Sequence, residues 1–168
     1  MSEVLQINGF PPPQCAKEDA SMAVQPIPDG YHSVTPYLLT AEAARLIDFL
    51  KQAFAAEEHE RVSRPDGAIM HAEVRIGDSV VMMGEPMPPL APMPASLHVY
   101  VPDVDAVYQR ALRAGATPVM EPADQFYGDR SGGVKDPFGN LWWIGTHKED
   151  VPPDELARRA RAYMEQQR

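Results

Sequence analysis

The chain has 168 residues, a formal net charge of −9 and a hydrophobic fraction of 44%, which suits one domain or two small halves that share a core. The acidic balance, with no clustered Lys/Arg stretch, argues against a nucleic-acid partner. No apolar run reaches the roughly 18 residues of a membrane-spanning helix, and we identify no signal peptide. Cys15 is the only cysteine, so no internal disulfide can form. We therefore expect a cytoplasmic protein without a membrane partner.

Residues 1–29 are predicted to form a Pro-rich N-terminal extension, a partly disordered arm that includes Pro11-Pro12-Pro13. After it, the pattern of the first half predicts a strand over 33–39, a helix over 42–54, and strands over 58–63, 68–76 and 79–83. A Pro-rich linker over 85–95 follows. The second half is predicted to have a strand over 96–101, a helix over 103–114, and strands over 117–122, about 131–135 and 140–146, before a charged helix over 153–166. Apolar residues spaced from Ala43 to Phe54 indicate the first helix, and Thr40 is its expected N-cap.

The two halves of this pattern repeat each other. Asp103 at the start of the second helix lies 61 residues after Glu42 at the start of the first, and the turn centred on Gly139 lies 62 residues after the turn centred on Gly77. This nearly constant offset indicates two copies of one β-α-β-β-β module. The predicted fold class is therefore α+β, with modules 30–84 and 96–150 paired into one domain over 30–150 and a C-terminal helix within 151–168.

Five segments of the chain resemble one known superfamily. They are residues 30–38, 70–78, 97–101 and 124–130, and the Asp-Pro-Phe-Gly-Asn turn at 136–140. In this order they resemble the glyoxalase/bleomycin-resistance/dioxygenase (vicinal oxygen chelate) superfamily, in its PhnB-like branch. The resemblance implies two concave mixed sheets around a ligand cavity, helices on the convex faces, and a homodimer. It does not imply one reaction, because a fold does not fix a function.

Metal ligands in this superfamily usually lie on the first and last strand of each module. By the repeat, the matching positions here are Thr35, Val81, Ser96 and Trp143. Catalytic relatives carry His, Gln or Glu there, whereas two hydroxyls and two apolar side chains hold a divalent cation poorly. We therefore expect no metal and no other cofactor. A metal displaced onto His71, Glu73 and His98 is a less favoured alternative.

Strand alternation separates side chains that face the cavity from those that face the helices. The expected catalytic candidates are His71, Glu73 and His98, because histidine titrates near neutral pH and a neighbouring carboxylate can orient it. The expected ligand-binding residues, which offer aromatic rings and one guanidinium, are Tyr37, Tyr100, Tyr127, Arg130 and Trp143. No role is assigned to His32, His59 or His147.

Each candidate also has a purely structural interpretation. His71 and Glu73 could lie on a solvated face, with Arg75 as the partner of Glu73. His98 could be a buried histidine bonded to a neighbour, and the aromatic residues, including Phe126 and Trp142, could be core. Arg130 could pair with an aspartate at 124, 129 or 136.

Two functions fit this sequence. The first is a small-molecule binding protein that holds an apolar or aromatic compound in the sheet cavity. The second is a lyase, isomerase or dioxygenase-like enzyme that uses His71, Glu73 and His98 with a displaced metal or none. The lack of the usual metal ligands and the aromatic side chains on the cavity face favour the first function.

Overall fold

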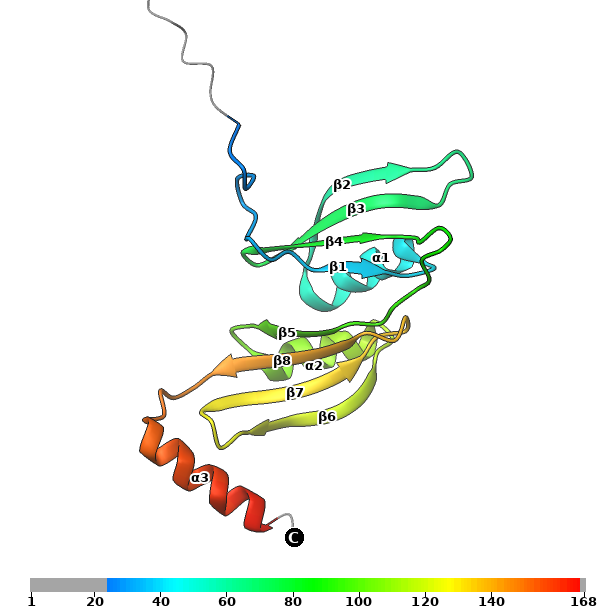
Figure 1. Ribbon diagram of the computed structural model, residues 1–168. Coiled ribbons are helices and arrows are strands. Elements are labelled where there is room, and N and C mark those ends of the chain that lie inside the picture. Colours follow the sequence, from blue (N-terminus) through cyan, green and yellow to red (C-terminus); the bar gives the residue numbers. More distant parts are fainter. Residues whose placement is uncertain (1–23, 167–168) are drawn as a thin grey trace, which may run out of the picture.

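Each half of the chain folds into a four-stranded sheet with one helix against it, in a computed structural model that describes residues 24–166 (Figure 1). The triple proline and Cys15 of the predicted N-terminal extension lie outside these residues. Within residues 24–166, no helix combines the length and the apolarity needed to cross a bilayer.

The first module forms sheet one. Its elements are β1 (Tyr37–Leu39), α1 (Ala43–Phe54), β2 (Glu57–Ser63), β3 (Ile69–Ile76) and β4 (Ser79–Gly84). The strand order is β1-β4-β3-β2, with β1 parallel to β4 and the other neighbours antiparallel. The helix α1 is the crossover that separates the parallel first strand from the antiparallel hairpins.

The second module forms sheet two in the same way. Its elements are β5 (Ser96–Tyr100), α2 (Val104–Arg113), β6 (Thr117–Asp124), β7 (Asp129–Lys135) and β8 (Leu141–His147). The order β5-β8-β7-β6 and the parallel pairing of β5 with β8 repeat those of sheet one. The predicted α+β fold with two β-α-β-β-β modules is therefore confirmed.

The start of sheet one differs from the sequence prediction. The strand β1 begins at Tyr37 rather than at residue 33, because Pro36 has no N–H for the ladder and contributes only its carbonyl, which accepts from Met82 N at 2.9 Å. The N-cap of α1 is Glu42 and not Thr40. The Thr40 hydroxyl accepts instead from the Glu42 backbone N–H at 3.3 Å, so it closes the turn before the helix.

The apolar faces of α1 and α2 pack against the sheets and against each other in one shared core. On α1, Leu46, Ile47 and Leu50 have no exposed surface, as the apolar spacing of the predicted helix requires. The ring of Phe54 lies 4.9 Å from that of Trp142 in sheet two, centroid to centroid. Trp142 is thus a core residue that joins the two modules.

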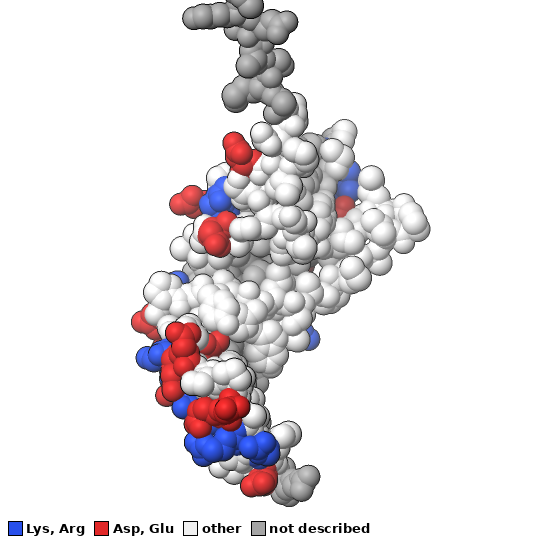
Figure 2. Space-filling view, turned by 60° about the vertical axis from the view of Figure 1, so that its left-hand side comes forward, with Lys and Arg blue, Asp and Glu red and all other residues white. Residues whose placement is uncertain are grey.

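The C-terminal helix α3 (Pro153–Gln166) lies beyond the second module and buries none of its described side chains. Arg159 on α3 donates two hydrogen bonds of 2.9 Å to Glu149. The ring of Tyr163 lies 5.2 Å from that of Phe126 in the β6–β7 turn. Charged side chains gather over this end of the molecule in Figure 2, so α3 is held largely by polar contacts.

Asp136, which is 3% exposed, organises the turn between β7 and β8. Its Oδ1 accepts from the backbone N–H groups of Phe138 and Asn140, both at 2.9 Å. Its Oδ2 accepts from the Asn140 amide at 2.8 Å and from the Trp142 indole N–H at 2.9 Å. Four donors converge on one buried carboxylate, which fixes Trp142 in the shared core.

We predict that Asp136→Ala lowers the free energy of unfolding by about 3 kcal/mol or more, because it leaves buried donors without an acceptor. Asp66 provides a matched control: it accepts from Ala68 N at 3.1 Å in an exposed turn, so Asp66→Ala should cost less than about 1 kcal/mol. Urea denaturation of both variants measures the difference. Equal losses would show that the Asp136 network does not stabilise the core.

Candidate functional site

The face of each sheet that α1 and α2 leave uncovered is called here the helix-free face. In sheet one, Tyr37 pairs with Met82, and Met82 pairs with Glu73, on this face. Val81 points the other way: it pairs with Val74 and is 5% exposed. The prediction that Val81 holds the metal-ligand position on the last strand of module one is therefore wrong, because Met82 occupies that position.

A chain of hydrogen bonds crosses the helix-free face of sheet one. The Tyr31 hydroxyl donates to Glu73 Oε2, and Glu73 Oε1 lies 3.1 Å from His71 Nε2. On the other side of the imidazole, Nδ1 lies 3.4 Å from the Tyr37 hydroxyl. Three of the predicted site residues, His71, Glu73 and Tyr37, are thus in contact, and Tyr31 joins them.

Glu73 is the buried member of this chain, at 6% exposure. Burial alone would raise the pKa of its carboxyl, but the hydrogen bonds from Tyr31 and His71 outweigh burial and lower the pKa below its ordinary value. The hydrogen bond to Glu73 also raises the pKa of the Tyr31 hydroxyl. Glu73 is therefore an ionised acceptor near neutral pH, and the purely solvated interpretation of this residue is excluded.

The segment before β1 covers part of the same face. A hollow of about 340 Å³ lies between Glu73, Met82 and residues of the segment that include Pro26, Ile27 and Tyr31. Gly30 has a φ of 82°, and a Cβ there would lie 3.0 Å from Arg75 Nη2. Glycine adopts this left-handed conformation without strain, so the chain can turn here, and the segment before β1 forms a wall of the hollow.

Two glycines make room for rings on the helix-free face of sheet two. A Cβ at Gly145 would lie 2.8 Å from His98 Nε2, and a Cβ at Gly133 would lie 2.7 Å from Cζ3 of Trp143. The imidazole and the indole therefore lie against bare backbone. Trp143 also donates from Nε1 to Ser96 Oγ at 3.1 Å, and the ring of His98 lies 4.6 Å from that of Tyr100.

This face also carries a second polar cluster, which the sequence did not predict. Asp129, 5% exposed, accepts from the Tyr100 hydroxyl at 3.0 Å through Oδ2. Its Oδ1 lies 2.7 Å from His147 Nδ1, and the other nitrogen of that ring lies 3.0 Å from Asp150 Oδ1. Asp129 and His147 are register partners on β7 and β8. The predicted strands begin two residues after Asp129 and end one residue before His147, so strands longer by these residues would have indicated the pair from the sequence.

The two sheets approach each other at β1 and β5. A hollow of about 400 Å³ between these strands is lined by residues that include Tyr37, Ser96 and His98. His98 is exposed, so the buried-histidine interpretation does not hold. Trp143 is its register partner on β8. The hollow therefore brings predicted site residues of both modules to one place.

Two predicted ligand-binding residues lie elsewhere. Tyr127, 39% exposed, is in the β6–β7 turn with its ring against that of Phe126. Arg130 lies in register with Thr146, one residue out of phase with Asp129, so it faces the helix side. It donates two hydrogen bonds, of 2.7 and 2.8 Å, to Asp105 at the start of α2. Its guanidinium is thus engaged within the fold.

The residues at the family's ligand positions do not fit a divalent cation. Thr35 Oγ1 donates to the carbonyl of His32 at 3.0 Å, and Ser96 Oγ accepts from Trp143. Met82, on the last strand of module one, offers only a thioether sulfur, which is a soft and weak metal ligand. Within residues 24–166, no three His, Cys, Asp or Glu side chains are grouped so that they could hold a metal.

We predict a pH-dependent contribution of His147 to stability. Hydrogen bonds to Asp129 and then Asp150 raise its pKa above the ordinary value of 6.5. A raised pKa in the folded state stabilises the protein below about pH 6.5, and this gain is lost as pH rises through the folded pKa. His147→Gln should therefore be less stable than the parent at pH 5.5 and equal to it at pH 9, in urea denaturation. A pH-independent difference in stability between His147→Gln and the parent would refute the ion pair.

Comparison with known proteins identifies the family. A family model described as "Glyoxalase/Bleomycin resistance protein/Dioxygenase superfamily" matches residues 30–144. An uncharacterized protein of Mycobacterium bovis is 42% identical over 135 residues, which cover 74% of this chain and 89% of the relative. An uncharacterized protein of Mycobacterium tuberculosis H37Rv has the same identity over the same length, with 79% of the relative covered.

Solved structures agree in fold. TioX from Micromonospora sp. ML1 is 28% identical with a TM-score of 0.60, and the match covers 68% of this chain and 97% of TioX. A structure described as "putative 3-demethylubiquinone-9 3-methyltransferase, PhnB protein" from Bacillus cereus is 16% identical with a TM-score of 0.57 and covers 68% and 99%; at that identity it shows the fold alone. Both the matched segment and the paired modules lead to one conclusion: the chain belongs to the glyoxalase/bleomycin resistance protein/dioxygenase superfamily.

Proposed function

We propose that the protein binds a small apolar or aromatic molecule on the helix-free faces, between Tyr37 of module one and Tyr100 and Trp143 of module two. The observation that carries this proposal is the hollow between β1 and β5, lined by Tyr37 and His98. Tyr37, which lines this hollow, is 44% exposed, and Tyr100, two residues beyond His98 on the same face of β5, is 65% exposed. Exposed rings grouped around a hollow are typical of ligand sites.

The chemistry of these rings favours a flat, apolar ligand. The hydroxyls of Tyr37 and Tyr100 already have partners in His71 and Asp129, which leaves their ring faces for stacking. The ring of Trp143 lies against Gly133, and its N–H donates to Ser96. A ligand would therefore gain most from apolar area, with the His98 ring as the adjustable hydrogen-bond partner.

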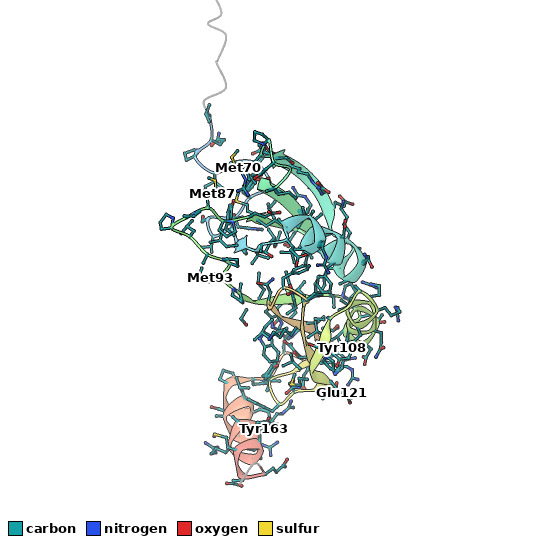
Figure 3. All side chains as sticks on the ribbon, turned by 90° about the vertical axis from the view of Figure 1, so that its right-hand side faces the viewer. Met70, Met87, Met93, Tyr108, Glu121 and Tyr163 are labelled. Atoms are coloured by element: carbon teal, nitrogen blue, oxygen red, sulfur yellow. The ribbon has the colours of Figure 1, made fainter. Side chains whose placement is uncertain are left out.

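We further propose that a second copy of the chain closes this site, as a homodimer of the PhnB-like branch would, in the cytoplasm. Exposed apolar side chains on the side away from α1 and α2 support the dimer, among them Met70, Met87, Leu90 and Met93 at 49–64% exposure. Figure 3 places Met70, Met87 and Met93 together on that side. Covering these side chains would remove apolar surface from water and enclose the rings.

The dimer is tested by size-exclusion chromatography with light scattering at tens of micromolar protein. We expect a mass of twice that of the chain, and Met93→Glu should shift the population towards monomer by placing charges in the contact. A monomer at every concentration would rule out closure of the site by a second copy.

A second candidate function has one observation in its favour. The chain of hydrogen bonds from Tyr31 through Glu73 and His71 to Tyr37 is built from groups that transfer protons. An enzyme of the lyase, isomerase or dioxygenase-like class could use it, with His98 on the neighbouring sheet, without a metal at the usual positions. Metal analysis separates the two candidates: protein purified without chelators that carries stoichiometric Zn, Ni, Mn or Fe favours the enzyme.

For the binding function, we predict that 1-naphthol quenches tryptophan emission saturably. His98→Gln should weaken its binding several-fold, because glutamine keeps hydrogen bonding but lacks the imidazole ring. It should change the free energy of unfolding by less than about 1 kcal/mol, since His98 is exposed. His59→Gln, at an exposed residue on β2, is the control and should leave binding unchanged. Equal affinities of the parent and both variants would contradict the site.

A further inference from the structure

A cavity of about 580 Å³ lies between the two modules, along β5. Its apolar lining includes Phe54, Val81, Leu97, Val99, Val107 and Trp142. The volume falls within the range of about 300–1,000 Å³ that is typical of small-molecule sites. The cavity borders the hollow between β1 and β5 at Pro36, Leu97 and His98, which line both, whereas Phe54, Val107 and Arg110 line the cavity and not the hollow.

The internal repeat shows that this part of the core is incomplete. Leu38 in β1 is 2% exposed, whereas Val99, which holds the matching place in β5, is only partly buried. Leu97 and Val101, on the same side of β5, are also only partly buried. A strand side chain that faces the helix layer is normally covered by it. The apolar wall of β5 is therefore open to the cavity.

Arg110 on α2 supplies a fixed positive charge to this cavity. Its Nε–H donates to the carbonyl of Ala53 near the end of α1 at 3.2 Å, which orients the guanidinium. Among the described residues, Arg110 takes part in no ion pair, although Arg130 and Arg159 each have two carboxylate partners. In a chain of net charge −9, a partly buried, oriented guanidinium without a carboxylate is placed for an external anion.

We propose that the cavity between the modules binds an organic monoanion with an apolar body, whose carboxylate or sulfonate pairs with Arg110. The apolar body would lie along Leu97, Val99 and Val101. Asp78, on the β3–β4 turn, also lines the cavity. A second negative group on the ligand would meet this carboxylate, so the site selects a monoanion over a dianion.

The first test uses 8-anilinonaphthalene-1-sulfonate, an apolar monoanion that fluoresces when shielded from water. Arg110→Gln should raise its dissociation constant about ten-fold, since it removes a charge-assisted pair. Arg113→Gln is the matched control: it makes the same change one turn along α2, outside the cavity lining, and should leave the constant within two-fold. Asp78→Asn should lower it. An equal effect of the two arginine changes, or no binding by the parent, overturns the proposal.

The second test locates the probe by the two indole N–H signals in NMR, because the chain has two tryptophans. Trp142 lines the cavity and Trp143 lies on the helix-free face; Trp143→Phe assigns them. The probe should shift the Trp142 signal first, and Val99→Phe, which fills the cavity, should abolish that shift even where Arg110→Gln fails to fold. A shift of the Trp143 signal alone would overturn this inference without contradicting the proposed site on the helix-free face. Loss of 1-naphthol binding alone would contradict that site and not the cavity site.

Discussion

The alternation of side chains along each strand is the constraint on which the candidate site depends. Leu38, Val74 and Ile144 are removed from water by the helix layer, and this burial drives the fold. Because successive side chains point to opposite faces, burying these residues sends their neighbours to the helix-free face. His98 and Trp143 are placed in this way, as the neighbours of core-side residues. The position of the site thus follows from the packing of a core that contains none of its residues.

Alternation decides which face a side chain points to, but a ring on that face also needs space against the backbone, and glycine provides this space. Rings that lie against a sheet need backbone without a Cβ, because a Cβ at Gly133 or Gly145 would overlap the neighbouring ring. The repeat keeps one such glycine in both modules: Gly84 matches Gly145, and a Cβ there would lie 2.6 Å from the Met70 carbonyl oxygen and 2.8 Å from the Tyr37 hydroxyl. The same device thus admits a tyrosine in sheet one and a histidine in sheet two, and the two modules differ in chemistry on a common backbone.

Much of the fold could be predicted from the sequence, because a 61-residue offset and apolar spacing are linear signals. Alternation also placed Tyr37, His98, Tyr100 and Trp143 on the correct face. The prediction at Val81 was wrong, because a repeat offset of 62 instead of 61 selects a side chain on the opposite face of the strand. Alternation could not predict the pair of Asp129 and His147, because that pair depends on where the strands end and on their register. It also could not predict that Arg130 pairs with Asp105, because Asp105 lies on another element. Contacts between elements are properties of packing and leave no local signal.

The two proposed sites share β5, and this has a physical consequence. Among residues 24–166 the strand is hydrogen-bonded on one edge only, to β8, so it is held less firmly than an inner strand. Tyr100 reaches across the helix-free face to Asp129 and also lines the cavity, together with Val99 and Val101. A ligand that shifts β5 at one site therefore changes the geometry of the other site. Linkage then requires each ligand to alter the affinity of the other by the same factor, and the open edge of β5 is where that coupling would arise.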